Sequence, residues 1–247
     1  MKPCWIIGKW RERIDSGTTT IQILPKSQYC WNLARYDGQP VSKDFLLACL
    51  TAWSQYGDAN LKELAQKMIK GIQRKDTPDK CIYEWFKSCY LLFQGTEGIE
   101  MTHRTIFPPS TCRTISPSVN VWEEKLSDPL EAALFIGALT DKSFAYKRFG
   151  MRTVMFIFPQ PGGSPQQSFY FSWSVDGTNW KAINMEHAGS MTFEENEKQT
   201  SSELKSLLEK KAEILNSLDE KGVYIGDASY AVDFKKASEK FGIRSLP

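Results

Sequence analysis

The sequence predicts an α+β fold, in which a helical layer packs on an antiparallel β-meander and a helical extension follows at the C-terminus. Residues 151–185 alternate with the period of strands and contain turn residues between the apolar runs. Residues 42–149 instead show the 3.6-residue period of amphipathic helices. The order of strands, helices, strands and helices is typical of α+β proteins. We expect a core domain over residues 1–190 and the extension over residues 191–247.

The first forty residues are expected to form strands and turns. Residues 5–11 and 18–24 are rich in β-branched and aromatic side chains, which favours two strands, and Pro25 ends the second. Residues 28–34 are a third candidate strand before the turn at Asp37.

Two amphipathic helices are expected next. The apolar stripe of residues 42–57 predicts the first, with Ser42 as its N-cap. The second covers residues 60–72, and Asn60 with Glu63 is interpreted as its capping box. The face of the second helix opposite to its apolar stripe is basic and carries Lys62, Lys67, Lys70, Arg74 and Lys75.

Further helices are expected before the meander. Residues 77–95 begin with Thr-Pro, a strong helix start, and continue with helical periodicity. Residues 98–122 contain several prolines and predict a long loop with one strand near its beginning. Helices are then expected from residue 127 and over residues 141–149.

The meander should be the centre of the core. Val154, Phe156 and Phe158 share one face of its first strand, and the other face is also apolar, so this strand is expected to be buried on both sides. Phe169 and Phe171 lie on the apolar face of the second strand, where the helical layer is expected to cover them.

In the extension, Thr200 and Glu203 are interpreted as a capping box for a helix over residues 200–222. Asp227 is expected to cap a last helix that ends at Gly242. Their apolar stripes are expected to contact another copy of the chain through Leu204, Leu208, Leu215, Leu218, Tyr230, Phe234 and Phe241.

The composition excludes several classes of protein. The chain has 247 residues, a hydrophobic fraction of 41% and a net charge of +2. No apolar run approaches the ~18 residues of a membrane-spanning helix, and the start lacks the apolar core of a signal peptide. We therefore expect no membrane partner and a cytoplasmic location, with the nucleus as the alternative.

The motifs of common enzymes are absent from the sequence. It has only two histidines, His103 and His187, and no Cys-x-x-Cys pair, phosphate-binding loop, dinucleotide fingerprint or serine elbow. The six cysteines are interpreted as structural or incidental thiols. No catalytic residue, metal ligand or cofactor is predicted, although Cys112 near His103 keeps a cysteine enzyme formally open.

The basic side chains are the best functional candidates. One group projects from the second helix and the loop after it, another lies at the entrance to the meander, and both suit phosphate binding. Tyr29, Trp31 and Tyr56 are expected to be exposed and able to stack on bases. The predicted nucleic-acid contacts are Lys67, Lys70, Arg74, Lys75, Lys80, Lys142, Lys147, Arg148 and Arg152.

The end of the chain, Asp233-Phe234 to Lys240-Phe241-Gly242 with the terminal Leu246-Pro247, resembles the C-terminal helix and tail of orthobunyavirus nucleoproteins. This resemblance covers only these residues, and the meander has no counterpart in that family. It implies that the C-terminal arm docks on the next protomer and that RNA lies in a basic cleft between helical lobes.

We therefore expect a non-enzymatic, nucleocapsid-like protein that binds nucleic acid, with single-stranded RNA as the favoured form, and that assembles with itself. The alternatives are an adaptor or host-directed antagonist, which would recruit another protein through the helix at residues 200–222, and an enzyme of unrecognised class.

Overall fold

The structure is a computed structural model, and it describes residues 26–35, 37–72, 77–103, 107, 112–143, 149–160 and 166–245. The strands expected at residues 5–11 and 18–24 lie outside the described residues. The same holds for residues 144–148, which form most of the short helix expected before the meander.

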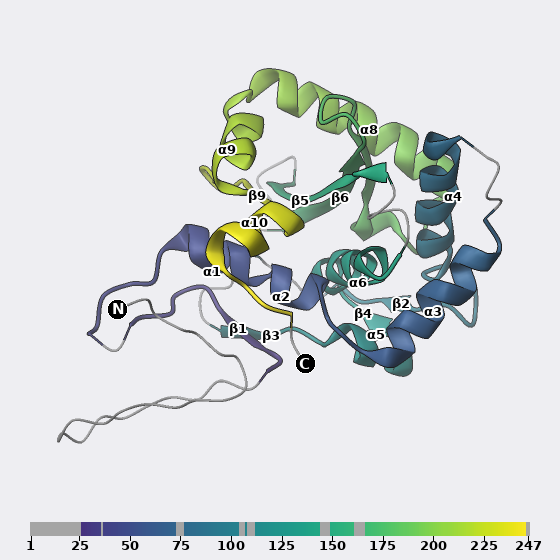
Figure 1. The fold of residues 1–247 in the computed structure, drawn as a ribbon, viewed down its shortest axis with the longest axis horizontal. Coiled ribbons are helices and arrows are strands. Elements are labelled where there is room, and N and C mark those ends of the chain that lie inside the picture. Colours follow the sequence, from purple (N-terminus) through teal and green to yellow (C-terminus); the bar gives the residue numbers. More distant parts are fainter. Residues whose placement is uncertain are drawn as a thin grey trace.

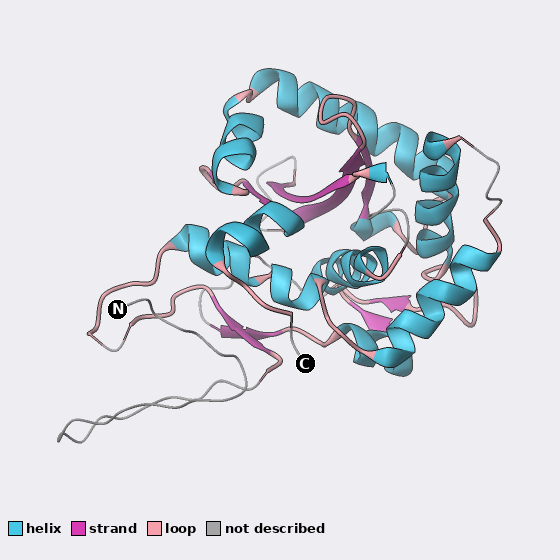
Figure 2. Cartoon of the chain, in the orientation of Figure 1, coloured by secondary structure: helices cyan, strands magenta, loops and turns pink. Residues whose placement is uncertain are grey.

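The fold is α+β, as predicted, and its centre is a five-stranded antiparallel sheet (Figure 2). The expected meander forms three neighbouring strands of this sheet in consecutive order. Two strands from the C-terminal segment continue the sheet beyond the first strand of the meander. In spatial order the strands are β7 (Lys181–Asn184), β6 (Gln167–Ser174), β5 (Arg152–Pro159), β9 (Tyr230–Asp233) and β8 (Val223–Ile225).

The central strand β5 is buried on both faces, which confirms the prediction from its continuous apolar run. Val154 and Phe156 belong to the hydrophobic cluster on one face of the sheet. Met155 and Ile157 belong to the larger cluster on the other face. Because side chains alternate along a strand, such a run needs a helical layer on each side.

The larger cluster lies between the sheet and a layer of helices that includes α6, whose ribbon runs through the middle of the molecule (Figure 1). Phe86 stacks on Trp173 of the sheet with a ring-centroid distance of 4.1 Å. The expected cover of the aromatic face is therefore confirmed at this position. The helices of this layer are α1 (Lys43–Cys49), α2 (Thr51–Ser54), α4 (Pro78–Leu91), α6 (Pro129–Asp141) and α10 (Phe234–Phe241).

The opposite face of the sheet is covered by α8 (Phe193–Lys210) and α9 (Glu213–Lys221), at the top of Figure 1. Leu204, Leu208, Ile214 and Leu218 pack there against β5 and its neighbours. The C-terminal segment thus supplies one helical layer and two strands of the sheet, and its core is continuous with that of residues 26–190.

Two small sheets lie beside the helical layer. Their strands are β1 (Gln28–Cys30) paired with β3 (Cys112–Thr114), and β2 (Glu100–Met101) paired with β4 (Leu126–Ser127). The remaining elements are α3 (Ala59–Lys70), α5 (Ser118–Glu124) and the 3-10 turn η1 (Met185–His187).

Several predicted helix starts are wrong. The N-cap of α3 is Asp58, whose carboxylate accepts from the backbone N–H of Asn60 and Leu61. Helix α8 starts seven residues before Thr200, at a capping box of Thr192 and Glu195. The first part of α8 is rich in acidic residues and shows no obvious apolar stripe, so the sequence pattern does not predict it as a helix.

The helix predicted from Asp227 is in fact strand β9 followed by α10, which Asp233 caps. Residues of β9 pair with β5 from Val154 to Ile157, so the sheet overrides the local helical pattern. The first predicted helix is divided in two at Leu50.

Candidate nucleic-acid interface

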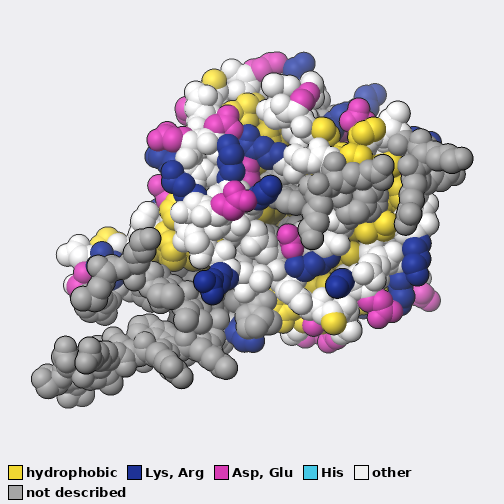
Figure 3. Space-filling view, in the orientation of Figure 1, with side chains coloured by type: hydrophobic (Ala, Val, Ile, Leu, Met, Phe, Trp, Pro, Cys, Tyr) yellow, Lys and Arg dark blue, Asp and Glu magenta, His cyan; other side chains and the backbone are white. Residues whose placement is uncertain are grey.

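The first predicted basic group is carried by the outward face of α3. Leu61 and Ala65 are fully buried and anchor the helix, while Lys62, Lys67 and Lys70 are exposed. Figure 3 shows Lys and Arg side chains gathered at the lower right edge of the molecule, over α3, with acidic side chains beside them. We call Lys62, Lys67 and Lys70 the α3 lysines.

The positive charges of the α3 lysines are balanced by few acidic side chains on the same helix. Glu63 is the only acidic residue of α3, and it forms an ion pair with Lys67 at 2.8 Å in which both side chains are mostly exposed. Lys67 lowers the pKa of Glu63 through a hydrogen bond and its charge, and Lys70 adds a smaller effect. Among the described residues, no ion pair involves Lys62 or Lys70. From the sequence, Lys62 is expected on this face but not among the nucleic-acid contacts.

Other members of this group flank α3. Lys80 is exposed in the first turn of α4. Arg74 and Lys75 belong to residues 73–76, which lie outside the described part of the chain.

In the second predicted basic group, the described members Arg152 and Lys142 form ion pairs with carboxylates of their own chain. The side chain of Arg152 is only 18% exposed, and its Nε and Nη1 donate to Asp233 at 2.5 Å and to Asp219 at 2.6 Å. Its guanidinium also lies 5.5 Å from the centre of the Trp180 ring. Arg152 is thus a structural cation between β5, β9 and α9, and is not available to a phosphate in this arrangement. Lys147 and Arg148 lie outside the described residues.

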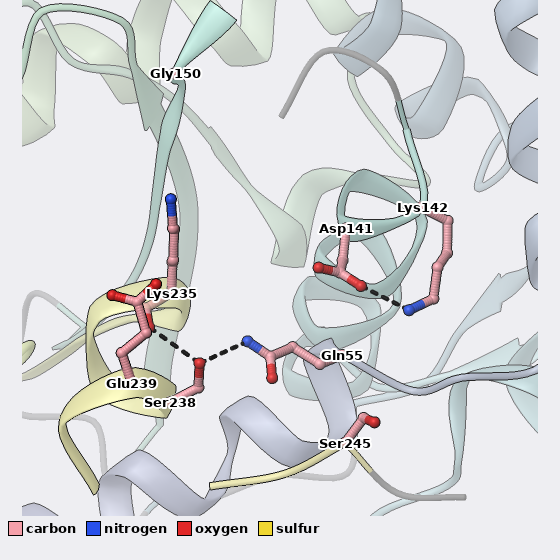
Figure 4. A pocket seen from close by; sticks show the side chains of 8 residues that line it. All are labelled: Gln55, Asp141, Lys142, Gly150, Lys235, Ser238, Glu239 and Ser245. Atoms are coloured by element: carbon pink, nitrogen blue, oxygen red, sulfur yellow. Dashed lines mark hydrogen bonds and ion pairs between the residues drawn. The ribbon is translucent and has the colours of Figure 1, made fainter. Parts of the chain in front are cut away.

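Lys142 lines a hollow of about 590 Å³ between the C-terminal ends of α2 and α6 and one side of α10. In Figure 4, Lys235 and Glu239 stand on one side, Asp141 and Lys142 on the other, and Gln55 points between them toward Ser238. Gln55 Nε2 donates to Ser238 Oγ at 2.9 Å, and Lys142 Nζ lies 2.6 Å from Asp141 Oδ2. Two lysines and two carboxylates therefore balance in this hollow, which makes it a weaker phosphate site than the α3 face.

The expected stacking aromatics are mostly in the core. Tyr29 and Trp31 are buried, so the expectation that they are exposed is wrong. Both pack on Phe107, and the Tyr29 hydroxyl donates to the carbonyl of Leu46 at 3.0 Å. Tyr56 is half-buried at the end of α2. Aromatic residues in a short stretch of sequence can be buried in the core or exposed for stacking on bases, and the sequence pattern alone does not distinguish these two cases.

The predicted protomer contacts are also taken up internally. Leu204, Leu208 and Leu218 are buried against the sheet, and Leu215 is half-buried beside them. Phe241 packs on Phe45 of the same chain at a ring-centroid distance of 6.3 Å. In this conformation Leu204, Leu208 and Leu218, together with the buried Tyr230 and Phe234, are packed inside the chain, whereas Leu215 and Phe241 keep part of their surface exposed.

A second cavity, of about 700 Å³, is lined by His103, Lys125 and Glu186 among other residues. Burial raises the pKa of Glu186, against hydrogen bonds from Gln160 and Ser168 and the charges of His187 and His103. Cys112 does not line this cavity, so the Cys112–His103 pair considered from the sequence is not assembled there.

Within the described ranges, no group of three or more His, Cys, Asp or Glu side chains could hold a metal ion. The same part of the chain has no helix with the length and apolar character needed to cross a bilayer.

Comparisons with protein-family models, with curated proteins and with solved structures found no match to this chain. The class of protein is therefore defined by the fold itself, a five-stranded antiparallel sheet between two helical layers.

Proposed function

We propose that this protein binds nucleic acid, with single-stranded RNA as the favoured form, through phosphate contacts to the α3 lysines. The observation that carries the proposal is the exposure of three lysines on one helix that contains a single carboxylate. Each lysine that neutralises a phosphate releases a condensed counterion, which gives affinity without sequence specificity.

The arrangement of the α3 lysines suits an extended strand of nucleic acid. Lys62 and Lys70 are two helical steps of four residues apart, with Gln66 between them, so the row spans about 12 Å along the helix axis. Lys67 lies beside this row. Because Leu61 and Ala65 hold the opposite face in the core, the charges are presented from a fixed helix.

The ion pair of Lys67 with Glu63 does not remove this lysine from the site. Exposed pairs of this kind contribute roughly 0–1 kcal/mol, so a phosphate can replace the carboxylate as partner. Lys80, in the first turn of α4, would extend the contacts toward that helix. Arg74 and Lys75 belong to the same proposed set and lie between α3 and α4 in the sequence.

Self-assembly is proposed as the binding of several copies of the protein along one RNA strand. Among the described residues, the large hydrophobic side chains that are exposed are Leu91, at 47%, and Val175, at 43%. They lie on different elements, α4 and the turn after β6, and do not form an apolar interface. Light scattering should therefore give a monomer alone and larger particles with long RNA.

The test is fluorescence anisotropy with a labelled oligouridine at low salt. Replacing all three α3 lysines by glutamine should weaken binding at least about tenfold. The matched control replaces Lys198, Lys205 and Lys210 of α8, which are also exposed, by glutamine. It therefore has the same net charge as the α3 variant. This control should bind within about threefold of the natural chain. Absence of binding by the natural chain, or equal losses in both variants, would contradict the proposal.

A further inference from the structure

The first small sheet brings together two cysteines that are far apart in the sequence. Strands β1 and β3 are antiparallel, and Cys30 lies directly opposite Cys112. Both side chains are half-buried, and Cys30 is one of the groups that raise the pKa of the Cys112 thiol. Of the other described cysteines, Cys49 belongs to α1, and Cys81 and Cys89 belong to α4.

The register of the two strands sets the distance between the thiols. The backbone N–H of Ile115 donates to the carbonyl of Ser27. Ser27 and Ile115, which precede the pair of Gln28 and Thr114 in the register, are therefore a hydrogen-bonded pair. Because such pairs alternate along an antiparallel ladder, Cys30 and Cys112 form a non-hydrogen-bonded pair. The Cα atoms of such pairs lie about 4.5 Å apart, within the range of about 4.4–6.8 Å found in disulfides.

We propose that Cys30 and Cys112 are a redox-sensitive pair that forms a reversible disulfide across β1 and β3 when the protein meets a peroxide. The inference is independent of the proposed nucleic-acid binding.

The chemistry is a two-electron oxidation. One thiolate attacks the peroxide, the O–O bond breaks, and the sulfur becomes a sulfenic acid while water leaves after protonation. The sulfur of the second cysteine then attacks the sulfenic sulfur, its proton is lost, and a second water is expelled. The two thiols are oxidised to one disulfide and hydrogen peroxide is reduced to two molecules of water. A dithiol such as dithiothreitol reverses the reaction by exchange.

Burial raises the pKa of the Cys112 thiol to about 11, with further contributions from Cys30. Little of this thiol is ionised at neutral pH, so the attack by Cys112 is slow there and accelerates as the pH rises. This behaviour suits a pair that responds to sustained oxidation.

The disulfide would connect parts of the core that are distant in sequence. Next to Cys112, Arg113 forms a mostly buried ion pair with Asp128, the N-cap of α6. On the other strand, Tyr29 packs in the core beside Cys30. The link closes the chain between positions 30 and 112, which include α1 to α4, and so restricts the unfolded chain more than the folded one.

The experiment treats the full chain with hydrogen peroxide and maps its peptides without reduction. We expect one cross-linked species that joins the Cys30 and Cys112 peptides, is lighter by two hydrogen atoms and disappears with dithiothreitol. The thermal unfolding midpoint should rise by on the order of 10 °C on oxidation. Cys30→Ser and Cys112→Ser should abolish both effects, whereas Cys49→Ala should retain both. Separate oxidation of the two cysteines without a cross-link would overturn the inference.

A second measurement uses the natural chain alone, so it does not depend on how the variants fold. Phenylarsine oxide bridges two neighbouring thiols, and at one equivalent it should protect Cys30 and Cys112 together from alkylation by iodoacetamide. Alkylation of either cysteine at the rate of the untreated protein would contradict the inference.

Discussion

At the scale of single residues, the environment of a charge decides its role. Arg152 and Lys67 are both cations in basic stretches of the sequence, but the first lies between two carboxylates and the second on an open helix face. Asp233 is 2% exposed and also caps α10. The loss of Arg152 would leave this carboxylate buried without its cation, which is strongly unfavourable.

We predict that Arg152→Met lowers the free energy of unfolding by about 3 kcal/mol, measured by urea denaturation. The matched control is Lys236→Met, since Lys236 forms a mostly exposed ion pair with the same Asp219. That variant should change stability by less than about 1 kcal/mol. Equal effects of the two substitutions would show that Arg152 is a surface cation.

Glu186 gives a prediction for the pH dependence of stability. Burial raises the pKa of its carboxyl in the folded protein, so the folded state binds this proton more tightly than the unfolded state. The contribution of the proton to stability is complete below the unfolded pKa and is lost as the pH rises through the folded pKa. Glu186→Gln keeps an acceptor for Gln160 and removes the titration.

The stability of Glu186→Gln relative to the natural chain should therefore increase from about pH 4 to about pH 7. Urea denaturation across this range measures the difference. A difference that stays constant with pH would contradict the inferred environment of Glu186.

At the scale of elements, α8 depends on a start signal at Thr192, well before the leucines of its apolar stripe, Leu204 and Leu208. The hydroxyl of Thr192 accepts from the backbone N–H of Glu195, and the Glu195 carboxylate accepts from the backbone N–H of Thr192. Thr192→Ala should therefore destabilise the protein by about 1 kcal/mol in thermal or urea unfolding. Ser206→Ala, at an exposed position within α8, is the control and should change stability by less than about 0.5 kcal/mol. A Thr192→Ala effect no larger than that of the control would argue against the capping box.

The elements also show what the sequence can predict. The meander, α3, α4 and α6 follow from apolar periodicity, and α4 and α6 also from local start signals, which act within a few residues. Strand β9 depends on its pairing with β5, which is distant in sequence and leaves no local signal. For the same reason the Cys30–Cys112 pair is invisible in the cysteine spacing. The exposure of the α3 lysines was predictable, whereas the neutralisation of Arg152 required the positions of Asp219 and Asp233.

At the scale of the whole molecule, two hydrophobic clusters share one sheet, so the C-terminal segment is part of the core. Leu204 of α8 is fully buried against this sheet. We predict that Leu204→Ala lowers the free energy of unfolding by about 3 kcal/mol, independently of protein concentration. Leu91→Ala, at an exposed position, should change it by less than about 0.5 kcal/mol. A loss that depends on protein concentration would instead place Leu204 in a contact between copies.

The measurement that tests the proposed function most directly is the salt dependence of RNA binding. For single strands, the slope of log K against log salt is about −0.7 for each phosphate neutralised. Replacing the three α3 lysines by glutamine should make this slope less steep by about 2, while the three substitutions on α8 should leave it unchanged. Equal slopes for the natural chain and the α3 variant would contradict the assignment of α3 as the nucleic-acid interface.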